Sequence, residues 1–322
     1  MKFIEQQRVH TPANTGFVQR KYLDISYAPD TKSGFVSKLA PKCQPEPAGS
    51  RRTLDIYLPN EGEGPYPVII DIYGGGWCYG HKSSHKLEPA LNLLKRGFAV
   101  VSINYSLSYQ EPFPTQIYEV KAAIRYIRKN AAQYNLDPNK IALLGESAGA
   151  HLAAVSACSS AAGKLVDASW PNMDVSDEVQ AVIAVYCPVH FGIMKEMFEV
   201  EKQAWDLGTV IEEYGQEDSM EALVLGGAAK DKPEMVELAN PCTYINEKCP
   251  PFLFLHGDQD QVEPVVGAMM FAARIMAATT LDNVQFQIVK GAHHNIHDFE
   301  EDWIYDVEAA FLNKTFKKEI EK

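Results

Sequence analysis

The sequence predicts an α/β fold, in which a mainly parallel central sheet carries helices on both faces. The first observation is that short apolar runs alternate with helix-like segments from about residue 67 onward, as in folds of this class. The second is that most of these runs are almost continuously apolar, which is typical of parallel strands buried on both faces, whereas residues 284–289 alternate apolar and polar side chains. The third is length: 322 residues can bury one large core, so we expect a single domain over residues 1–322.

Each expected element has its own signal in the residues. The expected parallel strands are 67–72, 98–103, 141–144, 182–186, 251–257 and 284–289. Upstream, residues 18–28 and 51–58 predict two antiparallel edge strands, joined by a loop rich in Pro, Gly, Ser and Lys. The expected helices are 115–134, an Ala-rich segment after residue 147, 265–278 and 303–316. A turn is expected at 135–138, between the first helix and the next strand.

Residues 189–250 form the longest stretch between expected core strands. The stretch is rich in Glu, Met and Ala, and we expect a small helical cap because long connections are usually functional. An ordinary insertion packed on the sheet edge is the alternative. Four of its side chains are candidates for an acyl pocket or, equally, for core packing: Met194, Met197, Trp205 and Tyr214.

The composition limits the partners that this chain can have. Its net charge of −12 disfavours nucleic acids and anionic membranes as partners. The first eight residues have no apolar signal core, and no run approaches transmembrane length. The six cysteines form no C-x-x-C pair, so we interpret them as reduced thiols of a cytoplasmic protein and expect no zinc or other metal site. A homodimer is compatible with the sequence.

The segment Gly145-Glu146-Ser147-Ala148-Gly149 carries the strongest functional signal. It lies between an apolar strand and an Ala-rich helix, and a serine between two glycines at that turn is the nucleophile elbow of α/β-hydrolases. The glycines are needed because side chains there would collide with the neighbouring strand and helix. The helix that follows also directs its free N–H groups toward the reacting oxygen. The pentapeptide by itself is weak evidence, since a glycine-rich turn can produce it by chance.

A second motif follows an earlier strand. Tyr73 is followed by Gly74, Gly75, Gly76 and Trp77, and in α/β-hydrolases the loop at this place supplies oxyanion-hole amides. Consecutive glycines allow the backbone to approach an ester carbonyl closely. Trp77 predicts an anchored turn rather than a flexible loop, and we expect Tyr73 and Trp77 to contact substrate.

An acid and a base follow the last two strands. Asp258 and Asp260 come after the strand that ends at residue 257, and His293 and His294 come after the strand that ends at residue 289. The order serine, aspartate, histidine is that of α/β-hydrolases and differs from the chymotrypsin and subtilisin orders. The residues themselves leave open which aspartate and which histidine take part.

These motifs together resemble the hormone-sensitive-lipase-like α/β-hydrolases and the neighbouring feruloyl- and acetylxylan-esterase-like proteins. The similarity extends from about Leu54 to about Ile296, and its densest stretches are residues 74–77, 96–105, 136–141 and 145–149. It implies an α/β-hydrolase fold and a serine carboxylesterase that acts on short acyl groups, often acetyl groups on carbohydrate, without a cofactor.

The resemblance also implies roles for individual residues. Ser147 matches the nucleophile, Asp260 the acid and His294 the base. The oxyanion-hole amides match Gly75, Gly76 and Ala148.

The chain departs from the family pattern at four positions. Tyr73 replaces a histidine, Ser106 an arginine, Glu263 a valine and Ala150 a glycine. The first departure puts the anchoring of the oxyanion loop in question more than its existence.

The expected reaction is two-step acyl transfer on a small-molecule or oligosaccharide ester. Two alternatives remain. One is a peptidase acting on acyl-peptides, although the sequence has no propeller-like repeats. The other is a non-catalytic receptor of the same fold, which the retained His294 disfavours.

Overall fold

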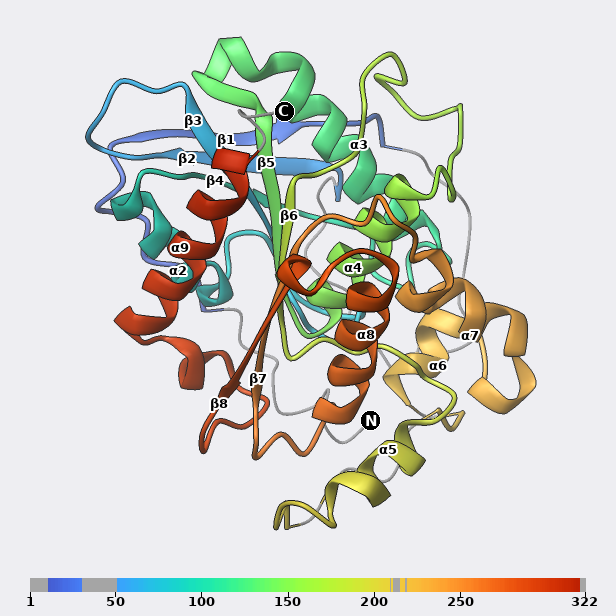
Figure 1. Ribbon diagram of the computed structural model, residues 1–322. Coiled ribbons are helices and arrows are strands. Elements are labelled where there is room, and N and C mark those ends of the chain that lie inside the picture. The colour runs from blue at the N-terminus through green and yellow to red at the C-terminus, as the bar shows by residue number, and fades with distance from the viewer. Residues whose placement is uncertain (1–10, 31–50, 209, 211–214, 218, 319–322) are drawn as a thin grey trace.

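The computed structural model describes residues 11–30, 51–208, 210, 215–217 and 219–318. Its centre is an eight-stranded sheet in the order β1-β2-β4-β3-β5-β6-β7-β8 (Figure 1). The strands are β1 (Arg20–Ser26), β2 (Thr53–Leu58), β3 (Tyr66–Ile72), β4 (Ala99–Ile103), β5 (Leu136–Glu146), β6 (Ala181–Val185), β7 (Phe252–Gly257) and β8 (Val284–Val289). Neighbours from β4 to β8 in this order are parallel, whereas β1 and β2 are antiparallel to their neighbours. The predicted α/β fold with antiparallel N-terminal strands is confirmed.

Helices cover both faces of the sheet (Figure 1). The α-helices are α2 (Glu88–Leu91), α3 (Thr115–Asn130), α4 (Ala148–Ala161), α5 (Met194–Glu201), α6 (Met220–Leu225), α7 (Pro233–Ala239), α8 (Val265–Ala278) and α9 (Asp302–Lys318). The 3-10 helices are η2 (His85–Leu87), η3 (Asn92–Arg96), η4 (Ala131–Tyr134), η5 (Ala229–Asp231), η6 (Pro241–Tyr244), η7 (Leu281–Asn283) and η8 (Ile296–Phe299). Figure 1 places α9 and α2 on one face and α3, α4 and α8 on the other.

Burial on both faces explains the continuous apolar runs. On β3, Ile70 and Ile72 belong to the core beneath α3, α4 and α8, whereas Ile69 belongs to the core beneath α9. Successive side chains of a strand point to opposite faces, so apolar side chains are needed on both sides of this run. Asp71 is a buried exception.

Two boundaries differ from the sequence-based prediction. We expected residues 51–58 at a sheet edge, but β2 lies between β1 and β4, and its side chains are almost all buried. We expected a turn at 135–138, but β5 already begins at Leu136, which pairs with Tyr66 across an irregular register. The turn is confined to Asn135, whose φ of 55° ends the preceding 3-10 helix.

Residues 189–250 contain the short helices α5, α6 and α7, which Figure 1 shows grouped beside α8. Helix α5 packs on α8 through Met197, whose Sδ and Cε lie close to Gly267. Tyr214, one of the pocket candidates, lies outside the described residues. That this segment acts as a cap stays a prediction.

The chain compensates for one departure from the family pattern. Ser106 donates through its amide and its hydroxyl to the buried carboxylate of Glu119, at 2.6 and 2.5 Å. The guanidinium of Arg52, from the start of β2, donates to the same carboxylate at 3.0 Å. A guanidinium therefore binds the carboxylate that also binds residue 106, although residue 106 is serine.

Candidate active site

Ser147 occupies the sharp turn between β5 and α4. Its backbone adopts φ 52° and ψ −124°, a conformation that side chains rarely take outside functional turns. A Cβ at Gly149 would overlap the carbonyl oxygen of Ile72, and a Cβ at Gly145 would overlap the backbone of Gly149. Both flanking glycines are therefore required by close approach of the backbone, which exposes Ser147 at the end of the strand.

Three side chains from distant parts of the chain form one hydrogen-bonded row. The Oγ of Ser147 lies 2.9 Å from Nε2 of His294, and Nδ1 of His294 lies 2.8 Å from Oδ2 of Asp260. Because an ionised carboxylate only accepts, Nδ1 carries the proton and Nε2 is free to accept from the serine hydroxyl. The loops after β7 and β8 bring Asp260 and His294 to Ser147 because the carboxyl ends of parallel strands share one edge of the sheet.

The environment of Asp260 holds this carboxylate in its ionised form. Its Oδ1 accepts from the amides of Val262 and Glu263, both at 2.8 Å. Its Oδ2 also lies 3.3 Å from Nε2 of the buried His256. Burial opposes ionisation, but His294 and His256 outweigh it and hold the pKa of Asp260 well below its usual range.

The neighbouring acid and histidine have other partners. Asp258 accepts from the amide of Gly291 at 2.6 Å, which fixes the β8 turn. His293 is largely exposed, and its Nδ1 lies 3.3 Å from Asp298. The structure therefore brings Asp260 and His294 to the serine and leaves Asp258 and His293 in the surrounding loops.

The glycine loop after β3 approaches the elbow with an unusual backbone. Gly75 and Gly76 have φ of 135° and 54°, and Trp77 follows with φ 58°. The amide of Gly74 donates to Oε1 of Glu146 at 2.5 Å, which connects the loop to the residue before Ser147. Ala148 begins α4 on the other side of Ser147, so its amide and those of Gly75 and Gly76 belong to the two segments that border the serine.

The buried side chains of Trp77 and Tyr73 anchor this loop. The indole Nε1 of Trp77 donates to Nδ1 of the buried His151 at 3.2 Å, and Nε2 of His151 donates to the carbonyl of Ala239 at 2.6 Å. Burial lowers the pKa of His151 to about 4, in keeping with the neutral ring that these two bonds require. The ring of Tyr73 stacks on Tyr105 with centroids 4.5 Å apart. Both predicted substrate contacts are 2% exposed or less, and their contact with substrate stays a prediction.

Glu146 is the main site residue that sequence reasoning overlooked. Its carboxylate accepts from the Gly74 amide, from Nζ of Lys86 at 2.9 Å and from the Tyr186 hydroxyl at 2.9 Å. The ring of Tyr186 in turn packs on His294, with centroids 4.4 Å apart. Burial would raise the pKa of Glu146, but Lys86 and the other donors hold it below its usual value. The only signal in the sequence was an acidic residue directly before the candidate Ser147.

The methionines that we considered for the pocket are core residues. Met194 and Met197 are 2% and 4% exposed. Trp205 is half-buried against Phe198 and Leu207.

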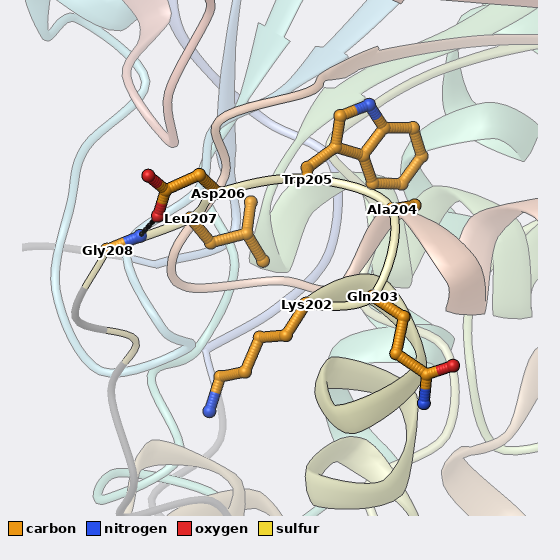
Figure 2. Close-up of a pocket in the computed structure, with 7 residues that line it drawn as sticks. All are labelled: Lys202, Gln203, Ala204, Trp205, Asp206, Leu207 and Gly208. Carbon is orange, nitrogen blue, oxygen red and sulfur yellow. Dashed lines mark hydrogen bonds between the residues drawn. The ribbon is translucent and has the colours of Figure 1, made fainter.

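A surface pocket lies where α5 ends, and Figure 2 shows the seven residues that line it, 202–208. Lys202 and Gln203 extend to one side of the chain and Trp205 to the other, so their side chains do not converge on a common point (Figure 2). The amide of Gln261, next to Asp260, donates to the carbonyl of Leu207, which attaches this segment to the acid loop.

Among the helices of the described ranges, none is both long and apolar enough to cross a bilayer. Within the same ranges, no group of three or more His, Cys, Asp or Glu side chains is placed to hold a metal ion.

Comparison with known proteins agrees with this geometry. Residues 54–275 match the family model BD-FAE, which covers more than half of the chain. The chain belongs to the BD-FAE family. Esterase LipQ of Mycobacterium tuberculosis is 30% identical over 77% of this chain and 55% of its own length. This BD-FAE member has an α/β-hydrolase fold, and relatives that it resembles, such as LipQ, are named esterases.

Two solved structures resemble the chain over nearly its whole length. A truncated carbohydrate esterase from gut microbiota has a TM-score of 0.75 and 26% identity, covering 95% of this chain and 99% of that one. A bifunctional GH43-CE protein of Bacteroides eggerthii has a TM-score of 0.71 and 29% identity, covering 92% of this chain and 38% of that one. The chain spans about half the length of curated relatives such as LipQ.

Proposed function

We propose that this protein is a serine carboxylesterase that hydrolyses short-chain acyl esters, acetyl esters above all. The observation that carries the proposal is the row of hydrogen bonds from Ser147 through His294 to Asp260. A nucleophile, a base within hydrogen-bond reach and a buried acid that orients the base are the three parts that acyl transfer needs.

In the first half-reaction, Oγ of Ser147 attacks the ester carbonyl while Nε2 of His294 takes its proton. The negative charge on the carbonyl oxygen is stabilised by the amides of Gly75, Gly76 and Ala148, each worth roughly 3 kcal/mol. His294 then gives the proton to the leaving alcohol, and an acyl-serine remains. Asp260 stabilises the imidazolium that forms in between.

In the second half-reaction, His294 removes a proton from water as the water attacks the acyl-serine. The acid leaves, and Ser147 regains its proton from His294. His294 gives back each proton that it accepts within the same half-reaction. The reaction therefore balances without a cofactor.

We further propose a carbohydrate ester as the natural substrate. The support is the likeness to a carbohydrate esterase, since that chain is matched over 99% of its length. Helices α5 to α7 are short, and lipid surfaces are bound by longer amphipathic helices. We therefore expect acetyl and propionyl esters to be preferred over chains of about eight carbons, without activation at a lipid interface.

The function is tested first at the nucleophile. Ser147→Ala should abolish covalent labelling by an organophosphonate and lower ester turnover by several orders of magnitude, because the members of a triad act as a unit. Undiminished labelling of the variant would refute the assignment of Ser147. Ser147-dependent turnover of acyl-peptides without turnover of esters would favour the peptidase alternative, and labelling without any turnover would favour the receptor alternative.

The substrate class is tested with p-nitrophenyl esters of increasing acyl length, followed by a panel of acetylated sugars. A maximum of kcat/KM at long chains, or a rate that jumps on a lipid emulsion, would identify a lipase and exclude the carbohydrate-ester proposal.

We also propose a cytoplasmic location. Each of the five cysteines in the described ranges is a free thiol, and four are buried. Free thiols persist in reducing compartments. A homodimer stays a prediction, to be checked by light scattering.

A further inference from the structure

One side chain of the segment 189–250 reaches the oxyanion loop. Helix α6 begins at Met220, and the hydroxyl of Ser219 accepts from the Ala222 amide at 3.2 Å, which fixes the start of the helix. The position of Met220 is thus set by a capped helix start.

Met220 packs directly on Gly76. A Cβ placed on Gly76 would overlap Sδ of Met220 and would lie 3.0 Å from its Cγ. The methionine therefore occupies the space that any side chain at position 76 would need.

The surroundings of Met220 form a small apolar cluster on the oxyanion loop. Cys78 and Leu223 are its buried members, while Met220, Tyr79 and Tyr109 are only partly buried. Part of the methionine thus remains accessible beside the loop, whereas Leu223 on the same helix is 4% exposed.

We propose that Met220 is a specificity-determining residue, which forms the wall of the acyl pocket and limits the acyl chain to a few carbons. The inference rests on the proposed function, because the amides of Gly75 and Gly76 would hold the ester carbonyl oxygen about 3 Å away. Met220 occupies the space beside Gly76. A substituent on a carbonyl carbon that is held at Gly76 therefore lies within contact distance of Met220.

The acyl side is assigned by the place of the base. The leaving alcohol must lie beside Nε2 of His294, which protonates it. Met220 packs with the oxyanion loop and with Tyr79 and Tyr109. The substituent that extends toward Met220 is then the acyl chain, and an unbranched thioether makes a wall that yields slightly to one more carbon.

The test is a paired series of kcat/KM values for Met220→Ala and the wild type, with acetyl, butyryl and hexanoyl esters of one alcohol. Each newly accommodated methylene contributes a factor of about four. We therefore expect the butyryl-to-acetyl ratio to rise on the order of tenfold in Met220→Ala. Met220→Phe should change this ratio in the opposite direction, and it gives a second reading if the alanine variant does not fold.

Leu223→Ala is the matched control, because it removes a buried side chain from the same helix and cluster. It should lower the melting temperature and leave the acyl-length profile unchanged. The proposal is overturned if neither Met220 variant changes the acyl ratio, or if selectivity changes only in a second series that varies the alcohol. Failure of the proposed function is a separate outcome, seen when Ser147→Ala retains full ester turnover.

Discussion

At the scale of single residues, adjacent side chains have sharply different environments. His294 is bonded on both ring nitrogens to Ser147 and Asp260, whereas His293 is mostly exposed and contacts Asp298. Asp260 accepts from two amides and lies between His294 and His256. The low pKa of Asp260 keeps it ionised well into acid, so the loss of activity at low pH should reflect protonation of another group.

These environments predict unequal effects of neighbouring substitutions. His294→Ala should reduce kcat about as much as Ser147→Ala, since both remove a member of one unit. His293→Ala, the matched control, should change kcat less than about threefold because its ring only contacts a surface acid. Steady-state kinetics of both variants decide the matter, and a larger loss in His293→Ala would show that the base is assigned to the wrong histidine.

At the scale of elements, the carboxylate of Glu146 connects several loops at the sheet edge that carries Ser147. Glu146 ends β5 and is bonded to the glycine loop after β3, to Lys86 of η2 and to Tyr186 after β6. Trp77 and His151 make a second link between the glycine loop, α4 and the end of α7. The histidine that Tyr73 replaces is thus not needed for anchoring, because these two sets of bonds hold the loop.

The first of these links predicts a separation of kcat from KM. Glu146→Gln keeps the shape of the side chain but removes its charge. Lys86 then loses its buried ion-pair partner, and the Gly74 amide loses a charged acceptor. We expect kcat to fall roughly tenfold to a hundredfold, as for hydrogen bonds to charged groups, with KM changing little. Lys129→Gln, which removes an exposed ion pair with Asp174, is the control and should leave both constants unchanged. An unaltered kcat in Glu146→Gln would contradict a positioning role for the carboxylate.

At the scale of the whole molecule, buried carboxyl groups make stability depend on pH. Burial raises the pKa of Asp71 on β3 to about 8 and that of Glu308 on α9 to about 8, and both side chains are buried. Between the ordinary carboxyl pKa of about 4 and pH 8, these groups bind protons in the folded state that they release on unfolding. The free energy of unfolding should therefore decrease as pH rises through this window.

Thermal unfolding between pH 5.5 and 8.5 measures this effect. We expect the melting temperature to decrease toward pH 8.5 in the wild type and to depend less on pH in Glu308→Gln. Asp260 acts in the opposite sense, because its lowered pKa contributes stability that is lost only as the solution becomes strongly acidic. A melting temperature that increases steadily from pH 5.5 to 8.5 would contradict the assignment of neutral buried acids.

The sequence by itself determined the features that depend on local pattern or on strand order. Apolar runs predicted β3 to β7, and alternation of apolar and polar residues predicted β8. Helical patterns predicted α3, α8 and α9, and the glycines around Ser147 predicted a close approach of the backbone. The order of serine, acid and histidine placed the three candidates at one edge of the sheet.

Only the tertiary structure decided the remaining relations, because they join residues far apart in the chain. Lys86 and Glu146 are 60 residues apart in the sequence, and Trp77 and His151 are 74 apart. Met220 contacts Gly76 although the two residues lie far apart along the chain. A pattern in a short stretch of sequence does not show which distant side chain will pack against it. That contact is decided only when the helices pack on the sheet in the folded protein.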